Sequence, residues 1–105
     1  MRSAINNKQE LITIITENGV AICKYGVKRL GIFGSFVRDE VNTKSDVDFY
    51  VEFYPEQKNF DNFMDLAEFL ENLVNRKIEL VTPQSLSKFI GPYILKEVEY
   101  VTLAA

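Results

Sequence analysis

The sequence predicts an α/β (α+β) protein in which helices cover a mixed β-sheet. Three observations carry this prediction: a strand from Asp46 to Phe53 that alternates strictly between apolar and polar residues, helical apolar stripes before and after it, and turn signals between them. The chain has 105 residues, of which 47% are hydrophobic and 26% charged, as in an ordinary globular protein. We therefore expect a single domain over residues 1–105.

The first predicted element is a helix that begins near Lys8. Apolar residues at helical spacing give it one buried stripe, which consists of Leu11, Ile14 and Ile15. This helix either breaks at Gly19 or continues to Tyr25, and we favour continuation, with Gly26 as the stop signal.

Two strands follow the helix. Residues Val27 to Phe33 predict a strand that enters the core, and Gly34-Ser35 end it. Residues 36–41 form a turn of helix or a tight loop. Alternation then separates the faces of the second strand: Val47, Phe49, Val51 and Phe53 point one way, and Asp46, Asp48, Tyr50 and Glu52 point the other.

The second half predicts further helices around one short strand. Asn59 caps a helix over residues 60–74, and residues 77–81 form a strand with Glu79 on its polar face. Thr82-Pro83 starts a last helical region, which Gly91-Pro92 interrupts. We expect the long helix to bury Phe60, Phe63, Met64, Ala67, Leu70 and Val74, and the last region to close the core with Leu86, Phe89, Ile94 and Val98.

Composition excludes several kinds of chemistry. Lys and Arg number 12 against 15 Asp and Glu, so the net charge of −3 argues against binding long nucleic acid. Histidine is absent, which removes His-based catalysis and most zinc sites. The single cysteine, Cys23, fits a reducing compartment. With no apolar run near the ~20 residues of a membrane helix and no signal-peptide pattern, we expect a cytoplasmic protein without membrane contact.

Asp46 and Asp48 form the first candidate site. Two residues apart on one strand face, they lie roughly 6.6 Å apart along the backbone. Like charges held this close repel unless a cation lies between them, and Mg²⁺ prefers such oxygen ligands together with phosphates. Taken alone, the pair is also compatible with a solvated strand face.

Gly34-Ser35 forms the second candidate site. Glycine allows a ligand oxygen to approach its amide closely, and Ser35 adds a hydroxyl. Arg38 offers a positive charge to the same anion or an ion pair to a neighbouring carboxylate. A plain strand-ending turn is the alternative. Together the two sites place a phosphate cradle beside a metal site, as a nucleoside triphosphate and its Mg²⁺ require, and Glu79 offers a third carboxylate.

The pattern Gly34-Ser35-x10-Asp46-x-Asp48 resembles the DNA-polymerase-beta-like nucleotidyltransferase superfamily. The stretch from Tyr25 to Arg38 looks like its minimal nucleotidyltransferase (MNT) branch. The resemblance implies the minimal nucleotidyltransferase fold, ATP as substrate held through Gly34 and Ser35, and Mg²⁺ on Asp46 and Asp48, with the third carboxylate at Glu79. We expect Arg38 and Ser45 to contribute to nucleotide binding.

The resemblance also implies a partner and a reaction. MNT proteins often act as antitoxins beside a HEPN-domain toxin, to which they transfer AMP from ATP, or which they block by binding. Two departures from the family pattern favour a binding-only antitoxin: Glu79 stands where Asp is usual, and Val37 and Asp39 stand where Ala and Gly are usual. A third alternative, nucleotide transfer to a small molecule or to RNA, fits the acidic charge and the short chain least well.

Overall fold

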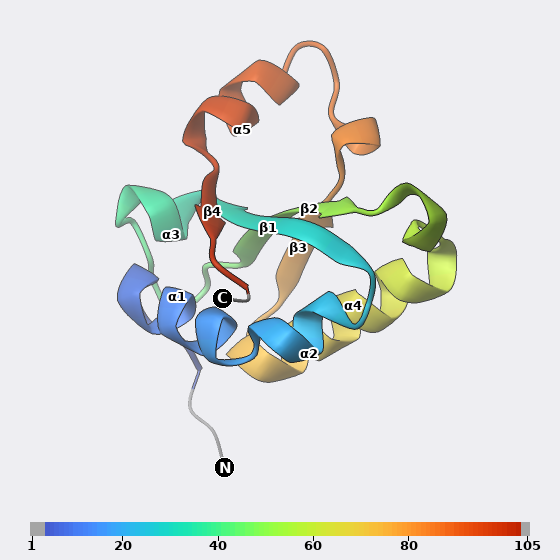
Figure 1. Ribbon diagram of the computed structural model, residues 1–105. Helices are drawn as coiled ribbons and strands as arrows, with labels where there is room; N and C mark the ends of the chain where they lie inside the picture. The colour runs from blue at the N-terminus through green and yellow to red at the C-terminus, as the bar shows by residue number, and fades with distance from the viewer. Residues whose placement is uncertain (1–3, 104–105) are drawn as a thin grey trace.

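The computed structural model describes residues 4–103 and contains a four-stranded mixed sheet in the order β3-β2-β1-β4. Strands β1 (Val27–Phe33) and β2 (Val47–Phe53) pair antiparallel, β2 pairs parallel with β3 (Ile78–Val81), and β1 pairs antiparallel with β4 (Glu99–Val101). Helices α1 (Lys8–Glu17), α2 (Gly19–Cys23) and α4 (Phe60–Val74) lie on one side of the sheet, and α5 (Gly91–Glu97) stands on the other side (Figure 1). The predicted mixed sheet covered by helices is confirmed.

The core lies between the sheet and α1, α2 and α4. The apolar side of β2 contributes Val47, Phe49 and Val51, all fully buried, as the alternation predicts. The opposite side is less polar than expected, because Tyr50 is also buried. Its ring contacts Tyr100 of β4 at a centroid distance of 6.3 Å, so the added fourth strand covers it.

The N-terminal helix is interrupted, which corrects the expectation of one continuous helix. Asn18 separates α1 from α2, and its side-chain amide donates to the Ile14 carbonyl at 2.8 Å. A Cβ on Gly19 would overlap the Leu103 carbonyl, so the chain needs glycine there. Helix α2 ends at Cys23, before the predicted stop at Gly26, and Gly26 with its φ of 85° forms the left-handed turn that leads into β1.

Helix α4 has the predicted bounds but buries only part of the predicted stripe. Asn59 caps it by accepting from the Asn62 amide at 2.8 Å. Leu70 and Val74 are buried as predicted, together with Leu66 and Leu73. The other predicted residues are partly buried, as in Phe63 and Ala67, or exposed, as in Phe60 and Met64. The apolar stripe of α4 is therefore wider than the face that packs on the core. Helical spacing alone does not show which of its apolar residues are buried.

The C-terminal third departs most from prediction. Thr82-Pro83 starts only the short 3-10 turn η2 (Pro83–Ser85), and α5 begins at Gly91. Leu86, Ile94 and Val98 are only partly buried and Phe89 is 79% exposed, so these residues do not close the core. Strand β4 is an element that the sequence did not predict. The remaining short elements are α3 (Ser35–Arg38) and η1 (Pro55–Gln57). Within residues 4–103, no helix has the length and apolar character needed to cross a bilayer.

Candidate active site

Gly34 connects β1 to α3 and brings the backbone against β2. Its φ of 80° and ψ of −152° lie in a region that L side chains rarely adopt. The preceding residue, Phe33, pairs with Asp48 across the β1–β2 ladder, and a Cβ on Gly34 would overlap the Asp48 carboxylate. Glycine is therefore required for the close approach of this amide to the acidic strand.

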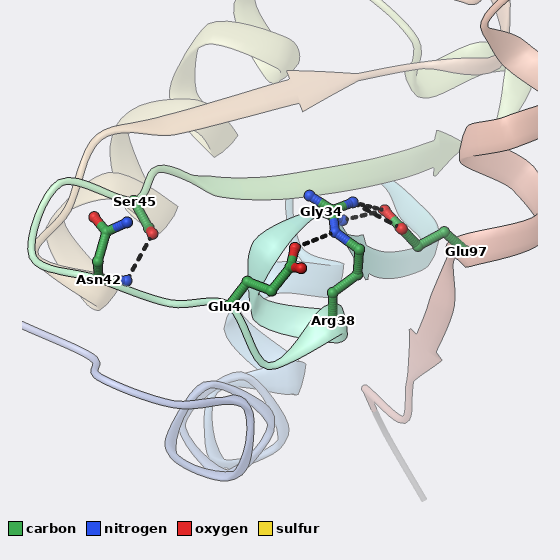
Figure 2. A network of polar contacts seen from close by, with 6 residues as sticks. All are labelled: Gly34, Arg38, Glu40, Asn42, Ser45 and Glu97. Atoms are coloured by element: carbon green, nitrogen blue, oxygen red, sulfur yellow. Dashed lines mark hydrogen bonds and ion pairs between the residues drawn. The ribbon is translucent and has the colours of Figure 1, made fainter.

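Arg38 and Glu97 meet directly beside Gly34 (Figure 2). The Gly34 N–H donates to Glu97 Oε1 at 2.6 Å, and Arg38 Nη1 donates to both Glu97 oxygens, at 3.0 and 2.8 Å. Arg38 Nε donates to Glu40 Oε1 at 2.7 Å. Burial alone would raise the pKa of Glu97, but the bonds from Arg38 and Gly34 outweigh it and hold this pKa below its ordinary value.

Asp48 and Glu79 are neighbours in the parallel β2–β3 pair. The pKa of Asp48 is raised to about 6, first by burial and then by the nearby Glu79 and Asp46 carboxylates, while Arg38 opposes the shift. Asp48 therefore binds a proton more readily than an ordinary carboxyl, because it is withdrawn from water and has other carboxylates near it.

One hollow contains most of the predicted site. It is bordered by β1, α3, β2, β3 and α5, and its lining consists of Phe33, Gly34, Arg38, Asp48, Glu79, Tyr93, Ile94 and Glu97. The structure thus brings together four of the expected residues, Gly34, Arg38, Asp48 and Glu79, from segments far apart in sequence. Ser35 follows Gly34 directly as the first residue of α3.

Ser45 and Asp46 line a different hollow, together with Arg76 and Lys77. Ser45 Oγ accepts from the Asn42 amide at 2.9 Å, which closes the loop before β2, away from the Arg38–Glu97 contacts (Figure 2). Arg76 holds the same loop by donating to the carbonyls of Asn42 and Ser45 at 3.0 and 2.8 Å. Asp46 nevertheless lies close enough for its charge to act on Asp48.

The acidic residues fit Mg²⁺ by their chemistry. Among residues 4–103, no three carboxylates are already clustered tightly enough to form a metal site. Asp48 and Glu79 supply hard oxygen ligands, and the Glu79 and Asp46 carboxylates near Asp48 would attract a cation. These two residues suit the cation best, with Asp46 as a third carboxylate nearby.

The sequence comparison agrees with this geometry. The nucleotidyltransferase-domain family matches residues 11–102. The chain belongs to this family. A relative is the protein adenylyltransferase MntA of Thermococcus cleftensis, which is 41% identical over 78 residues, covering 74% of this chain and 78% of the relative.

Solved structures show the same nucleotidyltransferase fold. The structure of a minimal nucleotidyltransferase matches with a TM-score of 0.78 at 23% identity, over 92% of this chain and 98% of that one. An MNT antitoxin in complex with the tri-AMPylated HEPN toxin of Shewanella oneidensis matches with a TM-score of 0.55 at 17% identity, over 84% of this chain and 71% of that one. The minimal nucleotidyltransferase fold predicted from the sequence is confirmed.

Two residues of this nucleotidyltransferase site were missed by sequence reasoning. Glu97 lies 63 positions from Gly34 and 59 from Arg38, and its neighbourhood carries no motif that links it to either. Tyr93 lines the hollow although its side chain is 75% exposed, and no sequence motif marks it.

Proposed function

We propose that this chain is a Mg²⁺-dependent protein adenylyltransferase that transfers AMP from ATP to a side chain of a HEPN-type toxin partner and so acts as an antitoxin. The observation that carries the proposal is the meeting of the Gly34 amide and the Arg38 guanidinium with Asp48 and Glu79 in one hollow. An anion-binding pair beside an acidic pair is what a triphosphate and its cation need. The protein adenylyltransferase among the relatives and the AMPylated toxin beside a structural relative support the acceptor class.

Each predicted residue has a role in this scheme. Gly34, Ser35 and Arg38 hold the triphosphate, and Ser45 keeps the loop before β2 closed through Asn42. Asp46, Asp48 and Glu79 hold Mg²⁺, which when bound neutralises the phosphate charge and so makes the α-phosphorus easier to attack. The site's use of ATP fits the cytoplasmic location expected from the sequence.

The reaction forms one bond and breaks one. The acceptor hydroxyl oxygen bonds to the α-phosphorus of ATP, the bond from that phosphorus to the bridging oxygen breaks, and pyrophosphate leaves. The hydroxyl proton passes to a carboxylate, for which we propose Glu79, because it is exposed at the edge of the hollow where a protein acceptor can reach it.

Replacement of the strand carboxylates tests the proposal. Transfer of label from α-labelled ATP to the partner should fall by about 1000-fold in Asp48→Asn and further in the Asp46→Asn/Asp48→Asn double variant. Asp65→Asn, which changes an exposed carboxylate on α4, is the matched control and should transfer AMP normally. Undiminished labelling by a double variant with a native circular-dichroism spectrum would show that the enzymatic proposal is wrong.

Neutralisation by binding alone is the second candidate function. It is favoured by Glu79 in place of the usual Asp and by the Glu97 carboxylate, which already accepts from the Gly34 amide. In that case the partner should be neutralised equally well by the parent chain and by the double variant. Neutralisation that needs both ATP and Asp48 excludes it.

A further inference from the structure

The carboxylate of Glu97 lies where the proposed triphosphate should bind. It accepts from the backbone N–H of Gly34 at 2.6 Å and from the Arg38 guanidinium at 2.8 and 3.0 Å. These are the same donors that the proposed function assigns to phosphate oxygens. Carboxylate and phosphate oxygens are interchangeable partners for such donors, because both are anionic acceptors that take charge-assisted hydrogen bonds.

We propose that Glu97 is a built-in competitor of the nucleotide, whose carboxylate must leave Gly34 and Arg38 before a triphosphate can bind. This inference rests on the proposed function, because it takes the triphosphate to use those two donors. It identifies Glu97 as a residue that sets nucleotide affinity, with no role in the chemical step.

The position of Glu97 in the chain makes this exchange possible. It is the last residue of α5, a short helix whose Tyr93 and Ile94 line the same hollow. The next residue, Val98, packs closely against Gly31 of strand β1. Its Cγ1 lies so near that a Cβ added to Gly31 would be only 2.5 Å away. Strand β4 then continues from Glu99. Release of Glu97 can therefore loosen α5 while the sheet stays intact.

The second acidic partner of Arg38 differs from Glu97 in one respect. Glu40 accepts from Arg38 Nε at 2.7 Å, but the Gly34 N–H donates to Glu97. Both carboxylates neutralise Arg38, but of the two only Glu97 also accepts from the Gly34 amide. We call the Gly34 amide and the Arg38 guanidinium the cradle. Comparing Glu40 variants with Glu97 variants therefore separates a general effect of negative charge from direct competition with the nucleotide for the cradle.

The loss of triphosphate affinity that this competition causes depends on the fraction of molecules in which Glu97 has left the cradle. If Glu97 occupies the cradle about nine-tenths of the time, the apparent Kd of a triphosphate is about tenfold weaker than its intrinsic value. Glu97→Ala, which removes the carboxylate, should therefore tighten triphosphate binding by about tenfold. Glu97→Gln keeps an acceptor oxygen without the charge and should tighten it by about threefold.

The test is calorimetric titration with two probes in the presence of Mg²⁺, a non-hydrolysable ATP analogue and inorganic tripolyphosphate. Glu40→Gln and Glu99→Gln are the matched controls, since each removes one negative charge and leaves Glu97 in place. We expect each control to bind both probes within about twofold of the parent chain. Circular dichroism checks that each variant is folded.

A structural readout distinguishes competition from a change in local charge. Probe binding to the parent chain should shift the Gly34 amide resonance and speed hydrogen exchange of the α5 amides, because Glu97 is released. In Glu97→Ala, α5 should exchange fast already in the free protein, and probe binding should leave that rate unchanged.

The outcomes separate this inference from the proposed function. Equal or weaker probe binding by both Glu97 variants, with the parent chain binding well, overturns the competitor role and leaves the proposed function standing. Failure of the parent chain and of every folded variant to bind either probe overturns both.

Discussion

Two regions of this chain use apolar side chains in opposite ways. In the first, residues 4–81, the sheet and helices α1, α2 and α4 bury Phe49 completely. In the second, residues 82–97, Phe89 and Tyr93 remain 79% and 75% exposed. Exposed rings such as Phe60 occur in the first region as well, but in the second region both aromatic rings, Phe89 and Tyr93, contribute surface. We therefore expect the first region to determine whether the protein is folded, while Glu97 of the second region accepts hydrogen bonds from Gly34 and Arg38 at the candidate site.

The largest expected effect tests this division directly. Phe49→Ala should lower the free energy of unfolding by about 3–5 kcal/mol, because it removes a fully buried ring and leaves a cavity. Phe89→Ala, the matched control in the second region, should change it by less than about 0.5 kcal/mol. Urea denaturation of both variants measures the difference. A comparable loss in Phe89→Ala would show that the second region belongs to the core.

The first region could be predicted from the sequence because its signals are local. The alternation in β2 gives the face of every residue, and the side chains of Val47, Phe49 and Val51 are buried as expected. Asn59 marks the start of α4 through a cap that needs no distant partner, and Gly26 marks the left-handed turn just before β1.

The C-terminal part of the chain, residues 82–101, could not be predicted because its structure depends on distant partners. Strand β4 has three residues and is defined by pairing with β1, with Leu30 opposite Val101. A segment this short shows no alternation that distinguishes it from the end of a helix. Helical apolar spacing, likewise, does not say whether a stripe such as that of α5 packs on the core or is exposed to solvent.

The hollow that contains Asp48 and Glu79 is lined by residues of both regions. The pH dependence of stability provides the next test, because Asp48 titrates in this hollow. The pKa of Asp48 is raised to about 6 from an ordinary value of 3.8, so the native state binds more protons than the unfolded state between these two pH values. The free energy of unfolding should therefore decrease as pH rises from about 4 to 6. Because Asp48 is partly exposed, we expect a contribution of about 1 kcal/mol.

Thermal denaturation in metal-free buffer measures this contribution. Asp48→Asn should lose the pH dependence, and Asp65→Asn should keep it. Added Mg²⁺ should also flatten the profile of the parent chain, because a cation takes the place of the proton between Asp48 and Glu79. The same slope in Asp48→Asn and in the parent chain would assign the pH dependence to other groups.

Most residues of the candidate site could be predicted from the sequence, but their positions relative to one another could be predicted only in part. Gly34, Arg38, Asp48 and Glu79 share one hollow because the β1–β2 and β2–β3 pairings bring three strand positions together. Asp46 precedes β2 and lines another hollow, although strand spacing predicts it beside Asp48. Its placement depends on the loop that Arg76 holds, and the Arg76–Ser45 contact spans 31 positions of sequence.

The smallest expected effect concerns the ion pair between Lys8 in the first region and Glu99, which follows the second region in strand β4. Lys8 Nζ of α1 lies 2.6 Å from Glu99 Oε2 of β4, but the two side chains are 37% and 45% exposed. Water screens such a pair, and holding two long side chains in one geometry costs conformational entropy. A double-mutant cycle of Lys8→Ala and Glu99→Gln should therefore give a coupling energy below about 0.5 kcal/mol, which vanishes in 1 M salt. Coupling above about 1 kcal/mol that persists in salt would mean that β4 is held in place by this charge pair. Weak coupling between Lys8 and Glu99 would mean that pairing with β1 holds β4 in place. Strand β4 would then keep its position whether Glu97 is bound to Gly34 and Arg38 or released from them.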